Sequence, residues 1–92
     1  MIQAILDKLG NNKFIELNNE CTYIKVDNAV TKDGLEGVII KGKLIDIGAD
    51  DGRIYYDLYT NSQDIISHPE QFNVISQEKY EKVLSNIYQR ML

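Results

Sequence analysis

The chain has 92 residues, which is enough for one domain with a buried core but too few for two. Its apolar fraction of 43% is ordinary for a folded protein, and no apolar run approaches the ~18 residues of a membrane-spanning helix. The single cysteine, Cys21, excludes an internal disulfide, and the first residues lack the basic and long apolar regions of a signal peptide. We therefore expect one cytoplasmic domain over residues 1–92, with no membrane contact.

The formal net charge of −4 comes almost entirely from the middle of the chain. Residues 44–70 contain six acidic residues and one basic residue, Arg53, whereas the residues before and after them are close to neutral. Nucleic-acid binding depends on clustered lysine and arginine, so this distribution argues against a nucleic-acid partner. It favours a protein partner with a basic or cationic contact surface. The alternative is an acidic rim that only keeps the protein soluble.

Apolar periodicity and turn residues divide the chain into a series of expected elements. In chain order these are a helix at 2–9, strands at 13–17 and 21–26, a polar connection at 27–34, two long strands within 36–60, a turn at 61–63, a helical turn at 69–72, an extended segment at 73–75 and a helix from 77 onward. Gly10 stands where a glycine often ends a helix. The domain thus divides into an N-terminal helix (1–10), a β-barrel or sheet (13–75) and a C-terminal helix (76–92).

The strongest local signal is Asp51-Gly52, which lies between the two long apolar-rich strands. Asp-Gly is typical of a type I′ hairpin turn, in which both central residues need positive φ. A two-residue turn here fixes which residues lie opposite each other and therefore which share a face. One face then carries Ile45, Ile47, Ala49, Ile54, Tyr56 and Leu58, and we expect it to be buried.

The first long strand changes its apolar phase near Gly42. The residues concerned are Val38 and Ile40 with one parity, and Ile45 and Ile47 with the other. One face cannot bury both pairs without a bulge or bend, which we expect between Lys41 and Ile45. A strand kinked in this way is typical of small five-stranded barrels. The alternative is a flat sheet in which this strand is central and both faces are covered.

The order of elements, a helix, several strands and a helix, predicts an α+β domain with an antiparallel sheet. The spacing of strands and turns from Lys13 to Ile75 resembles the pattern of SH3-like small barrels. This resemblance concerns the fold and implies no activity. We expect a small antiparallel SH3-like β-barrel or a strongly bent sheet, with a short N-terminal helix and an amphipathic C-terminal helix.

The C-terminal helix has the clearest periodicity in the chain, and Ser76 is a suitable N-cap. Its apolar stripe consists of Tyr80, Val83, Leu84, Ile87, Tyr88 and Met91. The stripe either covers the sheet or forms an interface for a homodimer or a larger partner. In the second case the interface residues are Tyr80, Leu84, Ile87, Tyr88 and Met91.

No group of residues predicts catalysis, a metal or a cofactor. Cys21 and His68 are the only cysteine and histidine, and they are explained more simply as a buried thiol and a loop residue. Asp50 and Asp51 are explained by turn formation. A calcium loop is not expected here, because the acidic residues and the glycine have the wrong spacing and no glutamate closes the loop. We therefore expect a protein that is not an enzyme and that has no cofactor.

The outward face of the hairpin is the candidate binding site. Arg53, Tyr55, Asp57 and Tyr59 alternate along its second strand, and Asp46 is expected to lie opposite Asp57. Two carboxylates in that position destabilise a sheet unless a cation lies near them. Together with the two tyrosines they are suited to a lysine or arginine side chain, or to an extended peptide.

A structural explanation of the same residues is that Tyr55 covers Gly48, and that Lys41 or Lys43 neutralises the aspartates. Taken as a site, they predict a non-catalytic protein–protein interaction module, which binds through this acidic, tyrosine-bearing face or assembles through its terminal helices. Two alternatives are a small-ligand or nucleotide-binding protein with a pocket at a subunit interface, and a nucleic-acid-binding small barrel.

Overall fold

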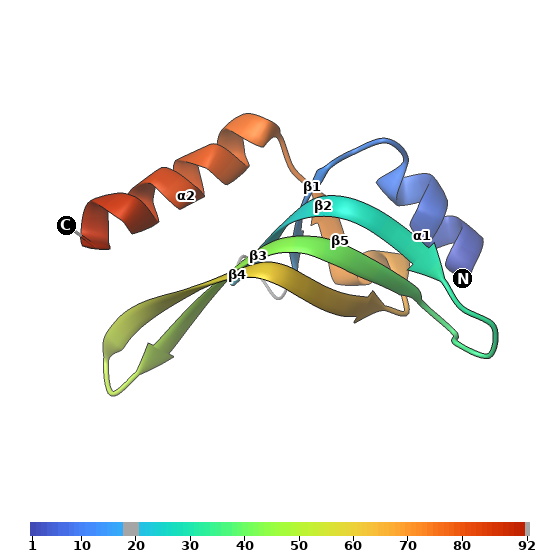
Figure 1. Cartoon of the computed structure of the whole chain (residues 1–92), viewed down its shortest axis with the longest axis horizontal. Helices are drawn as coiled ribbons and strands as arrows, with labels where there is room; N and C mark the ends of the chain where they lie inside the picture. Colours follow the sequence, from blue (N-terminus) through green and yellow to red (C-terminus); the bar gives the residue numbers. More distant parts are fainter. Residues whose placement is uncertain (18–20, 92) are drawn as a thin grey trace.

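The computed structural model describes residues 1–17 and 21–91, with the backbone only at residue 91. In chain order the elements are α1 (Ile2–Leu9), β1 (Phe14–Leu17), β2 (Thr22–Thr31), β3 (Val38–Asp50), β4 (Arg53–Ile66), the 3-10 helix η1 (Pro69–Gln71), β5 (Phe72–Val74) and α2 (Gln77–Met91). The strands form one antiparallel sheet in the order β4-β3-β2-β1-β5. The α+β class is confirmed. The expected closed barrel is wrong, because β4 and β5 are the two edges of an open sheet (Figure 1).

The two helices pack on opposite faces of this sheet and towards opposite ends of β3. Ile5 of α1 shares a buried cluster with Ile40, whereas Ile87 of α2 shares a second cluster with Ile45. Side chains alternate along a strand, so Ile40 and Ile45, five positions apart, point to opposite faces. Figure 1 shows α1 and α2 at the two ends of the molecule. The phase change near Gly42 therefore records a change of covered face, and no corner of a barrel is needed to explain it.

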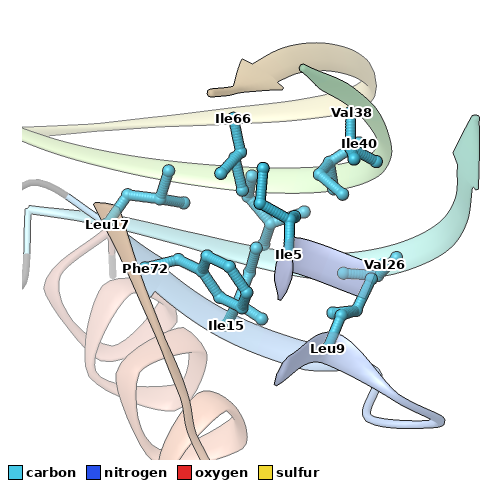
Figure 2. Close-up of a cluster of buried hydrophobic side chains, with 10 residues drawn as sticks. Ile5, Leu9, Ile15, Leu17, Val26, Val38, Ile40, Ile66 and Phe72 are labelled. Carbon is cyan, nitrogen blue, oxygen red and sulfur yellow. The ribbon is translucent and has the colours of Figure 1, made fainter. Parts of the chain in front are cut away.

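The first cluster, on the α1 side, is the larger of the two (Figure 2). Its buried members come from α1 and from all five strands or the segments that adjoin them: Ile5, Leu9, Ile15, Leu17, Ile24, Val26, Val38, Ile40, Ile66 and Phe72. Helix α1 has only 8 residues, so its amphipathic packing rather than intrinsic propensity must hold it in place. Lys8 adds a polar connection, since its ammonium donates to the carbonyls of Pro69 and Phe72.

The second cluster lies under α2 and contains Tyr23, Ile45, Tyr80 and Ile87 as buried residues. The rings of Tyr80 and Phe14 have their centroids 5.1 Å apart. At the same end of the helix, the ammonium of Lys79 lies 3.1 Å from a carboxylate oxygen of Glu16. At the other end, the guanidinium of Arg90 lies 5.7 Å from the ring centre of Tyr56. Helix α2 therefore crosses the sheet from β1 to β4.

Two irregularities flank Gly42 and bear out the one expected between Lys41 and Ile45. On one side, β2 has an extra residue between Val26 and Asn28, which pair with consecutive residues of β3. On the other side, β4 has an extra residue, because Gly42 pairs with Ser62 but Leu44 pairs with Tyr59. The polar segment at 61–63, expected to be a turn, is thus a bulged part of β4. Polar residues suit this position because β4 is an edge strand.

Other predicted boundaries agree with the structure, except for the end of β2. The helix at Ile2–Leu9 is confirmed, and Gly10 follows it with a φ of 53°. Ser76 caps α2 as expected, since its Oγ accepts a hydrogen bond from the amide of Lys79 at 3.0 Å. The connection expected from residue 27 to 34 is shorter, because β2 continues to Thr31 in register with β3.

The hairpin between β3 and β4 has the predicted turn and register. Asp51 and Gly52 have φ values of 50° and 76°, as a type I′ turn requires. The expected burial holds only for its inner half. Ile45 is buried and Ile47 is partly buried, but Ile54 is 58% exposed. Of the other residues expected on the buried face, Tyr56 is partly buried, and Ala49 and Leu58 are exposed. The reason is that the hairpin projects beyond the rest of the sheet (Figure 1), where α2 covers only part of it.

Candidate functional site

The hairpin places the predicted binding residues on the sheet face opposite α2. Asp46 pairs with Asp57, Gly48 with Tyr55 and Leu44 with Tyr59, and paired residues of an antiparallel sheet share a face. Leu44 packs against the α1-side cluster, which fixes the face concerned. We call the set Asp46, Arg53, Tyr55, Asp57 and Tyr59 the hairpin face. Helix α1 packs against Val38 and Ile40 near the start of β3. The hairpin face lies towards the end of β3, beyond the helix.

Both tyrosines of the hairpin face are about half exposed. Tyr55 is 47% exposed and Tyr59 is 48% exposed, whereas Asp46 and Asp57 between them are partly buried. The ring of Tyr55 lies across Gly48, since a methyl group on that glycine would overlap with the ring. The structural role expected for Tyr55 is therefore confirmed. About half of the side chain nevertheless remains available for contact.

The two aspartates lie directly opposite each other on neighbouring strands. In the described part of the chain no lysine or arginine forms an ion pair with either of them. Lys41 and Lys43 cannot neutralise them from β3, because their odd positions place them on the α2 side of the sheet; this expectation was wrong. Asp46 is instead 3.3 Å from the hydroxyl of Thr22, which donates a hydrogen bond to it.

The effect of this uncompensated charge appears at Tyr59. The negative charge of Asp57 raises the pKa of the Tyr59 phenol above its ordinary value of 10.0, with smaller contributions from partial burial and from the charge of Asp46. A side-chain hydrogen bond to Asp57 acts in the same direction. These groups are therefore close enough to share one electrostatic environment. A cation placed among them would relieve the repulsion between two carboxylates.

Most of the predicted α2 interface is occupied within the chain. Tyr80 and Ile87 are buried against the sheet, and Leu84 is partly buried. Burial is also the main cause of the raised pKa of Tyr80. Tyr88 is 53% exposed, and the side chain of Met91 lies outside what the structure describes. Among the side chains that the structure describes, the stripe thus mainly covers the sheet, and Tyr88 is the member exposed on the surface.

Cys21 and His68, the one cysteine and the one histidine of the sequence, are not part of the hairpin face. Cys21 is exposed rather than buried, and it directly precedes β2. His68 precedes η1, where Gln71 accepts hydrogen bonds from the amides of Ser67 and His68. Within residues 1–17 and 21–91 no three His, Cys, Asp or Glu side chains are grouped as a metal site would require.

Two surface hollows bear on the small-ligand alternative. One, of about 340 Å³, lies at the bulges around Gly42 and is lined by Asp27, Asn28, Lys41, Gly42, Asn61, Ser62 and Gln63. The other, of about 570 Å³, is lined by Met1, Ile2, Gln3, Glu36, Ser67 and His68. Small-molecule sites are usually mostly apolar with a few convergent polar groups, and neither hollow has that character.

No protein-family model, curated protein or solved structure matches the chain. No helix among the described residues is long and apolar enough to cross a membrane.

Sequence reasoning found the hairpin face but missed two features beside it. The hydrogen bond from Thr22 to Asp46 depends on the register between β2 and β3, which no turn motif specifies. The exposure of Ile54 and Leu58 was also missed. Alternation showed that they share a face, but it contains no information about how far a covering helix extends.

Proposed function

We propose that this chain is a non-catalytic protein-interaction domain whose hairpin face binds a lysine or arginine side chain of a partner protein. The observation that carries the proposal is the pair of opposed aspartates, Asp46 and Asp57, with no ion-pair partner in the described chain. Two exposed tyrosines, Tyr55 and Tyr59, flank this pair. The exposed Cys21 thiol is compatible with a reducing compartment such as the cytoplasm.

The physical basis is a cation that would be attracted by both carboxylates at once. A charge pair at about 4 Å is worth about 1 kcal/mol in bulk water and about 4 kcal/mol near a protein surface, before desolvation is subtracted. Because Asp46 and Asp57 are only partly buried, the lower half of that range is appropriate. The tyrosine rings add cation–π and apolar contacts with the stem of the partner's side chain. Arg53, at the outer end of the face, favours a partner that also carries an acidic group there.

The test is a titration of the isotope-labelled chain with short peptides that contain arginine or lysine, followed by NMR chemical shifts. We expect shifts at Asp46, Tyr55, Asp57 and Tyr59, and none with the same peptides carrying glutamate. Tyr59→Ala should weaken binding by about 1–3 kcal/mol. Tyr88→Ala is the matched control, because Tyr88 is a similarly exposed tyrosine on a different element.

Asp57→Lys should slow association with a cationic partner and reduce the dependence of its rate on salt. If the shifts map elsewhere, or if Tyr59→Ala and Tyr88→Ala bind equally well, the hairpin face is only a solvated surface. Assembly through α2 is a weaker candidate, because its stripe is largely used in packing against the sheet.

A further inference from the structure

The strand β4 is a long edge strand with an unpaired side. It runs over 14 residues, and within the described part of the chain β3 is the only strand paired with it. The other edge, β5, has only 3 residues. A long exposed edge presents backbone amides and carbonyls to any second strand, and proteins usually shorten, charge or cover such edges. The outer half of β4 has none of these protections except the charges of Arg53 and Asp57.

The turn determines which backbone groups of β4 face outward. In a hairpin closed by a two-residue turn, the flanking residues Asp50 and Arg53 form a hydrogen-bonded pair, and the pairs alternate from there. The residues of β4 with outward amides and carbonyls are therefore Ile54, Tyr56 and Leu58. The hydrogen bonds of β3 support this assignment, because the amide of Ile47, opposite Tyr56, points away from β4 and donates to the carbonyl of Cys21, directly before β2, at 2.8 Å.

The same three residues also carry apolar side chains at this edge. Ile54 is 58% exposed and Leu58 is 39% exposed, with the partly buried Tyr56 between them. All three project on the α2 side of the sheet, where Tyr88 of α2 is 53% exposed. Unpaired backbone groups and exposed apolar side chains thus coincide on one short segment.

We propose that this edge binds a second copy of the chain, with the two β4 strands antiparallel and centred on Tyr56. In that register Tyr56 faces its own counterpart, and Ile54 of each copy faces Leu58 of the other. On the opposite side of the sheet, Tyr55 faces Asp57 and Arg53 faces Tyr59. The outward amides and carbonyls of Ile54, Tyr56 and Leu58 in one copy then face those of the other copy. Asp57 of each copy faces the phenol of Tyr55 instead of another carboxylate.

Neighbouring registers pair shorter segments or less suitable groups. A register centred on Tyr55 also aligns outward backbone groups and sets Arg53 against Asp57, but the turn limits it to residues 53–57. A shift that centres the pairing on Asp57 brings two like charges together, which destabilises a sheet. A register whose midpoint falls between two residues would place the outward backbone groups of one β4 strand opposite the inward backbone groups of the other. The segment 53–59 is also bounded on both sides, by the turn at Asp51-Gly52 and by the bulge beyond Tyr59. Its midpoint is Tyr56, so the register centred there pairs the longest uninterrupted segment.

The proposal does not depend on the proposed function, since the pairing rests on the outward backbone groups of β4 and on the apolar side chains of the α2 side; Tyr55 and Asp57 of the hairpin face lie beside that interface. In the paired form the two sheets become one, and the two hairpin faces lie side by side on the same surface. Self-association would therefore present two copies of the acidic, tyrosine-bearing face to one partner.

The test compares the oligomeric state of the full chain and two variants by sedimentation velocity over a range of concentrations. The parent should show a concentration-dependent dimer. Ile54→Lys should weaken it by about tenfold or more, because each dimer would bury two lysine charges. Ile65→Lys is the matched control: Ile65 lies on the same strand and the same side, is 50% exposed, and is outside the paired segment. Circular dichroism checks that both variants are folded.

The register is tested separately by cysteine cross-linking in a Cys21→Ser background. Tyr56→Cys should form a disulfide-linked dimer under mild oxidation, since facing residues are about 5.5 Å apart between their Cα atoms, within disulfide reach. Ile54→Cys should not, because its counterpart lies four positions away along the pair. A parent that stays monomeric, a dimer that Ile54→Lys and Ile65→Lys affect equally, or equal cross-linking at positions 54 and 56 would overturn the proposal.

Discussion

Gly42 lies where the two irregularities of the sheet meet, and the structure makes a sharp prediction about it. The residue is buried, and its backbone passes against β2. A methyl group added at Gly42 would overlap with the carbonyl oxygen of Lys25 and would lie 3.2 Å from Cγ2 of Ile24. The carbonyl belongs to the backbone of a central strand, so it cannot turn away as a side chain can. Gly42→Ala must therefore displace β2 from β3.

The expected cost follows from two opposed contributions. Overpacking a well-filled interior typically costs about 1–3 kcal/mol, and the upper end applies where backbone must move. Replacing glycine by alanine within a strand returns about 0.5–1 kcal/mol, because the unfolded chain loses freedom. The net expectation is a loss of about 2 kcal/mol in the free energy of unfolding.

Gly48 provides a control on the same strand. A methyl group there would also overlap with another atom, but that atom belongs to the ring of Tyr55, which is 47% exposed and can swing outward. Gly48→Ala should therefore change the free energy of unfolding by less than about 1 kcal/mol.

Urea unfolding followed by circular dichroism measures both variants, with the midpoint and the slope fitted together. The reasoning is refuted if Gly42→Ala unfolds at the same urea concentration as the parent, or if Gly48→Ala is the more damaging of the two. Either result would mean that β2 and β3 do not approach each other at Gly42 as the structure has them.

Two further predictions concern α2 and the hairpin face. Ile87→Ala should cost about 2–4 kcal/mol because Ile87 is completely buried, and Leu84→Ala should cost less because Leu84 is only partly buried; equal losses in urea unfolding would contradict the packing of α2. The raised pKa of Tyr59 means that the folded state holds the phenol proton more tightly, so its contribution to stability is fully present below pH 10.0 and is lost as the pH rises through the folded pKa. Asp57→Asn should move the pKa of Tyr59 back towards its ordinary value. A phenolate absorbance titration measures this pKa if the curve of the same chain with Tyr59→Phe is subtracted. An unchanged pKa in Asp57→Asn would show that Asp57 is not the main cause.

The local parts of the fold could be predicted because single residues specify them. Asp51-Gly52 fixed the hairpin register, and with it the residues that share the hairpin face. Ser76 and Gly10 marked helix ends that the structure confirms. In each case the information lies within a few residues of the feature, as turns and caps are set by local backbone geometry.

The global parts could not be predicted from the same patterns. Parity shows that Ile40 and Ile45 point to opposite faces, but a closed barrel and an open sheet with a helix on each face produce the same parity. Deciding between them requires knowing which strands are edges, and this depends on contacts between distant segments such as β1 and β5. The exposure of Ile54 has the same origin, because it depends on how far α2 reaches along the hairpin.

The division of the core between two faces has a consequence for how the molecule opens. A single core must be lost as a whole, whereas two clusters on opposite sides of one sheet can be exposed one at a time. Undocking α2 would uncover Tyr23 and Ile45 while leaving the α1-side cluster closed. Amide hydrogen exchange should then separate the molecule into two groups, with the slower exchange on β1 and the inner parts of β2 and β3. The hairpin that carries the candidate binding residues belongs to the faster group, so a partner that binds there would be expected to slow its exchange.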